Sequence, residues 1–174
     1  MPTRWIFLSQ LVLGYLACLL VFRAYMLPAL RSMDRFRAQR VIATIHSFRF
    51  FGLVFILPGV VGPNLPAGFA VFAAWGDFAT GLLALLALLT ARIRPLFWSF
   101  VVAFNLVGAA DILVDYNHAV RFGLPNAAGQ LGAAYIVPIV YVPMLLITHV
   151  AAFYWMLRPQ LTAAQPIAGN AAAF

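Results

Sequence analysis

Several ionisable side chains interrupt apolar segments of this sequence, and their types and spacing suggest chemistry. His46 and Arg49 lie three residues apart within IHSFRFFGLVF (45–55), while Asp77 and His149 lie within two later apolar segments. A charge in apolar surroundings costs several kcal/mol unless it finds a partner or water. Arg49 and Asp77 are therefore expected either to form a buried ion pair or to form a site. In such a site, Arg49 would bind an anionic or carbonyl-bearing ligand and Asp77 would carry a proton.

The two histidines raise a second hypothesis. His46 and His149 fall at comparable depths in two different apolar segments, and bis-histidine ligation of a haem b needs that arrangement. Arg49 would then lie near a haem propionate. The alternative, in which both histidines are hydrogen-bonded packing residues, remains open from the sequence.

A further polar group follows the fourth apolar segment, in NLVGAADILVDYNH (105–118). Asp111, Asp115 and His118 recur at spacings of four and three, which places them on one helix face. They predict either a shallow divalent-metal or proton-entry site at the outer surface, or simply a helix end that meets water. Asn105 lies deeper and is expected to make an interhelical hydrogen bond.

Motifs of common enzymes are absent from the sequence. It contains no HExxH, CxxC or phosphate-binding loop, and its single cysteine, Cys18, cannot form a disulfide or a cysteine-based metal site within one chain. Ser47 neighbours His46, but adjacent helical residues point apart. No catalytic residue is predicted, the sequence offers no metal-ligand motif beyond that shallow alternative, and it leans against an enzyme without excluding one.

The elements that must position these residues are membrane-spanning helices. The 174 residues are 65% hydrophobic and 9% charged, far less charge than a soluble surface needs. The net charge of +7 is spread between apolar segments, so nucleic-acid binding is not expected. A bilayer core needs about 20 helical residues. The sequence therefore predicts an all-α integral membrane bundle of five spans, at about 5–27, 41–61, 67–90, 95–114 and 131–157.

Arginine placement predicts the orientation of this bundle. With five spans, Arg4 and Arg121 fall on one side, and eight arginines fall on the other side: Arg23, Arg31, Arg35, Arg37, Arg40, Arg92, Arg94 and Arg158. Because cytoplasmic loops are enriched in basic residues, the N-terminus is predicted outside and the C-terminus inside. Residues 1–158 form one transmembrane domain, and 159–174 are expected to be a disordered cytoplasmic tail.

Two of the predicted spans carry further signals. Pro138 and Pro143 should bend the fifth span, because each proline leaves a carbonyl without its helical donor. The third span has a stripe of small residues that allows close helix approach and should make it central. The stripe contains Ala70, Ala73, Ala74, Asp77, Thr80, Gly81, Ala84 and Ala87.

Residues 48–157 resemble a group of small, uncharacterised bacterial inner-membrane proteins. The pattern is FR-x-x-G, then L-P-x-x-F-A, then G-D, then N-x-x-G-x-x-D, then V-P…H. The resemblance implies a location in the bacterial inner membrane but names no reaction. The matching positions are Arg49, Gly52, Pro66, Gly76, Asp77, Asn105, Gly108, Asp111, Pro143 and His149.

Three functional hypotheses follow from the sequence. The first is a membrane protein that binds or transports a small ligand, a proton or an ion at a cluster formed by Arg49, Asp77, Asn105, His149 and His46. The second is a b-haem electron carrier, and the third is a structural or accessory subunit. The lipid bilayer is the expected partner, with a second copy or another membrane subunit as a further candidate.

Overall fold

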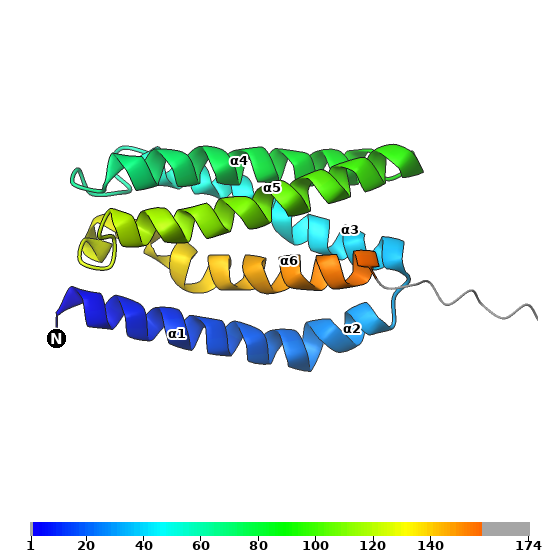
Figure 1. Cartoon of the computed structure of the whole chain (residues 1–174), viewed down its shortest axis with the longest axis horizontal. Coiled ribbons are helices and arrows are strands. Elements are labelled where there is room, and N and C mark those ends of the chain that lie inside the picture. The colour runs from blue at the N-terminus through cyan, green and yellow to red at the C-terminus, as the bar shows by residue number, and fades with distance from the viewer. Residues whose placement is uncertain (1, 158–174) are drawn as a thin grey trace, which may run out of the picture.

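The computed structural model describes residues 2–157, and within that range the long regular elements are all helical. The chain runs back and forth along one long axis, so that successive helices lie antiparallel (Figure 1). The expected tail, 159–174, lies outside the described residues. The elements are α1 (Thr3–Val21), η1 (Phe22–Met26), α2 (Leu27–Arg31), α3 (Arg35–His46), η2 (Ser47–Ile56), α4 (Ala67–Leu89), α5 (Arg94–Arg121), η3 (Ala128–Tyr135), η4 (Val137–Tyr141) and α6 (Val142–Leu157).

Four helical stretches in the described range are long and apolar enough to cross a membrane. They are Thr3–Arg31, Ala67–Leu89, Arg94–Arg121 and Val137–Leu157. Large apolar side chains are exposed along them, for example Leu13, Leu106 and Val150, each more than half exposed. This surface suits lipid and not water, so the prediction of an all-helical membrane-type bundle is confirmed.

The segment predicted as one span at 41–61 differs from the expectation. It begins as α3 at Arg35, changes at Ser47 into the 3-10 helix η2, and ends at Ile56. The buried residues of η2 are Arg49, Gly52 and Phe55. A 3-10 helix has three residues per turn, so this spacing of three aligns them along one side. Helical periodicity alone did not predict the change of helix type.

Helix α4 is buried along the predicted small-residue stripe. All eight residues of that stripe are buried, and so is Phe69. The stripe packs against η2 and α5. A methyl group added to Gly81 would lie 2.8 Å from the backbone nitrogen of Phe50, so the glycine allows η2 to approach α4 backbone to backbone. The predicted close packing of this stripe is confirmed, but α4 is not central: it packs on η2, α5 and α3 and lies along one edge of the bundle, opposite α1 (Figure 1).

The two prolines of the last predicted span act at η4. This element is a π-helical turn, and Pro143 cannot donate a hydrogen bond to the Ile139 carbonyl four residues earlier. A Cβ added to Gly14 of α1 would collide with that carbonyl oxygen. Cys18 Sγ donates to the neighbouring Val140 carbonyl at 3.5 Å. The opened backbone is therefore the surface on which α1 packs.

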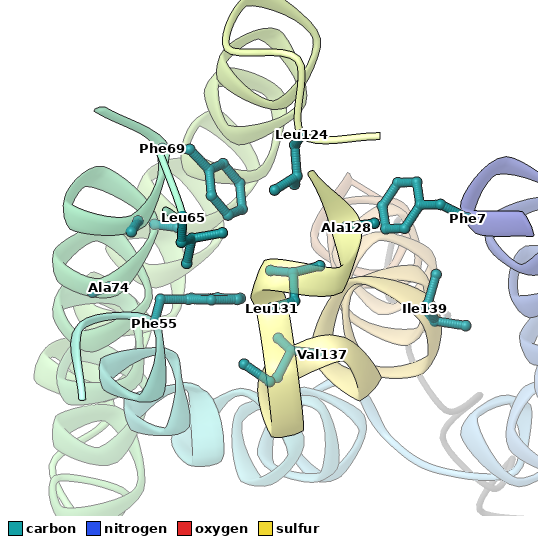
Figure 2. Close-up of a cluster of buried hydrophobic side chains, with 13 residues drawn as sticks. Phe7, Phe55, Leu65, Phe69, Ala74, Leu124, Ala128, Leu131, Val137 and Ile139 are labelled. Carbon is teal, nitrogen blue, oxygen red and sulfur yellow. The ribbon is translucent and has the colours of Figure 1, made fainter. Parts of the chain in front are cut away.

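The apolar core divides into two clusters at opposite ends of the bundle. Figure 2 shows the first, in which Phe55, Phe69 and Leu131 converge from η2, α4 and η3. The second surrounds Phe97 and Trp155 on α5 and α6. Along α4, the first cluster ends at Ala74 and the second begins at Ala84. Asp77 and Thr80 lie in the interval, which is where the polar site is built.

Candidate functional site

Arg49 is the centre of the polar site, and its side chain is 1% exposed. Nε donates to Asp77 Oδ1 at 2.7 Å, and Nη2 lies 2.7 Å from the same oxygen. Nη2 also donates to Asp111 Oδ2 at 2.5 Å. Nη1 donates to the Gly108 carbonyl at 3.2 Å and lies 3.2 Å from His149 Nε2. All three guanidinium nitrogens of Arg49 therefore have protein acceptors, through four hydrogen bonds.

His149 extends the network away from Arg49. Because Arg49 donates to Nε2, that nitrogen is the acceptor, and Nδ1 carries the proton that it donates to Asn105 Oδ1 at 2.9 Å. Asn105 Nδ2 in turn donates to the Val101 carbonyl at 2.8 Å. The expected interhelical hydrogen bond of Asn105 therefore joins α5 to α6. The imidazole is held neutral, in one tautomer and one orientation.

His46 is buried beside this network but bonds elsewhere. Its Nε2 lies 3.0 Å from Thr148 Oγ1, and that hydroxyl lies 2.9 Å from the Met144 carbonyl. Since the hydroxyl donates to the carbonyl, it accepts from His46. His46 Nδ1 is then an acceptor, and it has no hydrogen-bond partner in the described chain.

The two histidines do not fit a haem between them. Their ring centroids lie 4.0 Å apart with an interplanar angle of 43°. Axial imidazoles stand on opposite faces of a porphyrin, separated by the iron and two metal–nitrogen bonds of about 2 Å each. Those two bonds alone separate the ligating nitrogens by about 4 Å, and the ring centroids lie further from the iron than the nitrogens do. Rings whose centroids are only 4.0 Å apart therefore leave no room for the porphyrin plane. His149 Nε2 is also already engaged by Arg49.

Three glycines make the space that the ion pairs occupy. A Cβ added to Gly52 would collide with the Asp77 side chain, and one added to Gly76 would collide with Asp111. A Cβ on Gly108 would lie 2.6 Å from Arg49 Nη1. Because side chains in a packed bundle can approach backbone this closely only at glycine, each glycine has a steric role beside a charged group.

Asp111 lies in a different place from the one expected. The sequence groups it with Asp115 and His118 at the outer surface, because the fourth span is predicted to end near residue 114. Helix α5 instead continues to Arg121, so Asp111 is two to three turns inside it, and its carboxylate bonds Arg49. Its other oxygen, Oδ1, is buried without a hydrogen-bond partner among residues 2–157.

Asp115 and His118 remain apart from the Arg49 network. Each has a buried side-chain atom without a partner in the described chain, Asp115 Oδ1 and His118 Nδ1. The His118 ring packs edge-on against Phe72 with centroids 4.7 Å apart. No group of three metal-ligating side chains is assembled within residues 2–157. The structure does not bring Asp111, Asp115 and His118 together as a metal site.

A crevice leads from α1 and α5 toward the buried carboxylates. Its volume is about 90 Å³, and Asp77 and Asp115 line it together with apolar side chains such as Phe7, Leu11 and Ile112. Water occupies about 30 Å³ per molecule in the liquid, so the crevice has room for a few water molecules. It is a space through which water could reach the carboxylates of Asp77 and Asp115.

Sequence reasoning missed several parts of this site. Thr148 as the partner of His46, and the Gly108 carbonyl as an acceptor, carry no recognisable signal in the sequence. The role of Asp111 did have one, because N-x-x-G-x-x-D places Asn105, Gly108 and Asp111 one turn apart along α5. All three contact Arg49 or His149.

These features define a class of protein: an apolar helical bundle with a buried, charge-paired arginine between two apolar clusters. Residues 6–157 match the model of the family described as domain of unknown function (DUF8737). The match covers most of the chain, so the chain belongs to this family. No curated protein and no solved structure shows significant similarity to the chain.

Proposed function

We propose that this protein spans the bacterial inner membrane and that its Arg49 cluster binds and releases a proton. The observation that carries the proposal is the charge count around Arg49. One buried guanidinium meets the carboxylates of Asp77 and Asp111, both within 2.7 Å. If both carboxylates were ionised, the three groups together would carry one excess negative charge inside an apolar bundle. One proton removes that excess.

Two further observations support proton exchange at this site. Asp111 Oδ1 is buried without a partner, so it can carry a proton without breaking its bond to Arg49 through Oδ2. Asp115 lies one turn further along α5, also has an unpaired buried oxygen, and lines the crevice with Asp77. A few water molecules in that crevice would connect the carboxylates of Asp77 and Asp115.

The geometry argues against an anionic ligand on Arg49 in this conformation. All three of its guanidinium nitrogens already bond protein acceptors, so a ligand would compete with a carboxylate, Gly108 or His149. A proton needs no such displacement. Transport of a small ligand and assembly with a second copy remain predictions without a supporting contact.

Infrared spectroscopy of the purified protein tests proton binding. The C=O stretch of a protonated carboxylic acid should be present at neutral pH and should fall as the pH is raised. Asp77→Asn or Asp111→Asn should remove it, because one carboxylate then balances Arg49, while Asp34→Asn, a surface residue paired with Arg37, should leave it unchanged. A spectrum with no carboxylic acid band, or with a band that neither core variant changes, would overturn the proposal.

The proposal includes five membrane crossings, with α3 and η2 as the second. A 3-10 helix rises about 2.0 Å per residue and an α-helix about 1.5 Å. Residues 41–46 and the ten residues of η2 therefore extend about 29 Å, close to the thickness of a bilayer core. The segment has fewer residues than an α-helical span needs, but its length matches the thickness of the bilayer core.

The proposed orientation places the N-terminus outside the cytoplasm, on the basis of the arginine distribution. A single cysteine replacing Asn64, in a chain that carries Cys18→Ala, should react with a membrane-impermeant thiol reagent added to intact spheroplasts. Labelling that requires permeabilised membranes would reverse the orientation.

A structural role is the second candidate, and one observation favours it. The network around Arg49 joins η2, α4, α5 and α6 through buried bonds. Such a network holds helices in register even if no proton is exchanged. The infrared experiment separates the two candidates, because a purely structural cluster gives no pH-dependent carboxylic acid band.

A further inference from the structure

Helix α4 ends and α5 begins at one end of the bundle (Figure 1), and a second group of arginines lies there. Arg92 and Arg94 come from that turn and Arg40 from α3, and together they line an open pocket of about 520 Å³. The apolar side chains Leu88 and Leu89 line the same pocket.

One aromatic ring holds two of these guanidinium groups. Arg94 Cζ lies 3.6 Å from the centroid of the Phe36 ring, and Arg40 Cζ lies 5.6 Å from it. Cation–π contacts of this kind fix the planar groups without using their N–H donors. The donors of Arg40 and Arg94 therefore remain available to a ligand.

The positive charge of this pocket has no counter-ion in the described chain. None of its three arginines forms an ion pair or a side-chain hydrogen bond within residues 2–157. Of the aspartates, Asp34 pairs with Arg37, and Asp77, Asp111 and Asp115 lie in or beside the core. Like charges brought together repel one another, so an anion that neutralises them would be stabilised there.

We propose that this pocket binds the phosphate headgroup of an anionic phospholipid. Arginine matches phosphate through two parallel N–H···O bonds, and basic pockets at the ends of transmembrane helices suit lipid headgroups. A lipid is favoured over a free anion because the pocket is continuous with exposed apolar surface. Leu89 is 71% exposed and Ile93 is 55% exposed, so an acyl chain has a surface to follow.

Native mass spectrometry of the full chain in detergent tests this proposal, with phosphatidylglycerol as the probe. One lipid should remain bound to the wild-type chain. Substitution of Arg40, Arg92 and Arg94 by Gln should weaken its binding about 100-fold, from roughly fivefold for each arginine near a headgroup. The control variant, with Arg4, Arg23 and Arg121 changed to Gln, loses the same charge outside the pocket and should bind within about threefold of wild type.

Two further arms separate the alternatives. Phe36→Leu removes the ring between Arg40 and Arg94 without changing the charge, and it should weaken binding several-fold. Equal losses in the two triple variants would overturn the proposal, because binding would then follow net charge alone. Displacement of the lipid by inorganic phosphate at equal concentration would overturn its lipid part and identify free phosphate as the ligand.

Discussion

Arg49 is buried and paired, whereas the three arginines at the α4–α5 end of the bundle are exposed and unpaired in the described chain. Arg49 is 1% exposed, and all three of its guanidinium nitrogens meet protein acceptors, two of which are carboxylates. Arg40, Arg92 and Arg94 are exposed and have no carboxylate partner within residues 2–157. The difference follows from solvation. A guanidinium removed from water must be paired within the protein, whereas one at the surface is stabilised by water or by a ligand from outside.

The comparison predicts that the buried arginine determines stability and the exposed ones do not. We expect the largest effect from Arg49→Gln, which leaves Asp77 and Asp111 without a cation in the bundle. The free energy of unfolding should fall by about 3–5 kcal/mol. Unfolding in mixed micelles with increasing denaturing detergent, followed by circular dichroism, measures the change. A loss below that of Arg92→Gln would contradict the assignment of Arg49 as the central partner.

The second prediction concerns the two carboxylates that share Arg49. Asp77→Asn or Asp111→Asn alone leaves one anion beside the cation, so each should cost less than about 2 kcal/mol. The double variant leaves Arg49 unpaired and should cost about 1–3 kcal/mol more than the sum of the single variants. A double-mutant cycle in the same assay measures this coupling. Strictly additive losses would show that the carboxylates do not share one charge.

The third prediction tests the steric basis of the buried network. Gly52→Ala places a methyl group in the Asp77 side chain and should cost about 1–3 kcal/mol, because the ion pair must shift. Gly129→Ala is the matched control, since nothing lies within 4 Å of its added methyl group. Equal stability of the two variants would mean that Arg49 and Asp77 can separate without cost.

The smallest effect is expected at the exposed arginines. Arg92→Gln should change the free energy of unfolding by less than about 0.5 kcal/mol in lipid-free detergent, because its guanidinium makes no protein ion pair. Adding phosphatidylglycerol should stabilise the wild-type chain more than the Arg92→Gln variant. A large loss of stability in lipid-free detergent would show that Arg92 has a structural partner.

The sequence predicted those parts of the fold that depend on apolar length and on helical periodicity. The small-residue stripe from Ala70 to Ala87 is buried as expected, because periodicity alone determines which helix face can pack closely. Arg49 and Asp77 were recognised as partners because few other charges in the apolar segments could neutralise each other.

The missed features depend on three-dimensional contacts that periodicity does not encode. Helix α5 continues past residue 114, and polar residues of its last turns such as Asp115 and Tyr116 are partly buried against the bundle. Tyr116 Oη, for example, lies 2.5 Å from Tyr15 Oη of α1. The 3-10 geometry of η2 depends on its close approach to α4, which involves Gly52 and Gly81 on different elements. No local sequence rule links those two glycines.

The length of the segment Ser47–Ile56 depends on its helix type, which is 3-10 in this structure. If its ten residues became α-helical, the segment would shorten by about 5 Å, and successive side chains would turn by about 20° less at each step. His46, Arg49, Gly52 and Phe55 would then no longer lie along one line. The position of Arg49 opposite Asp77 and Asp111 therefore depends on the rise of η2, and an axial displacement of η2 would move the guanidinium relative to both carboxylates.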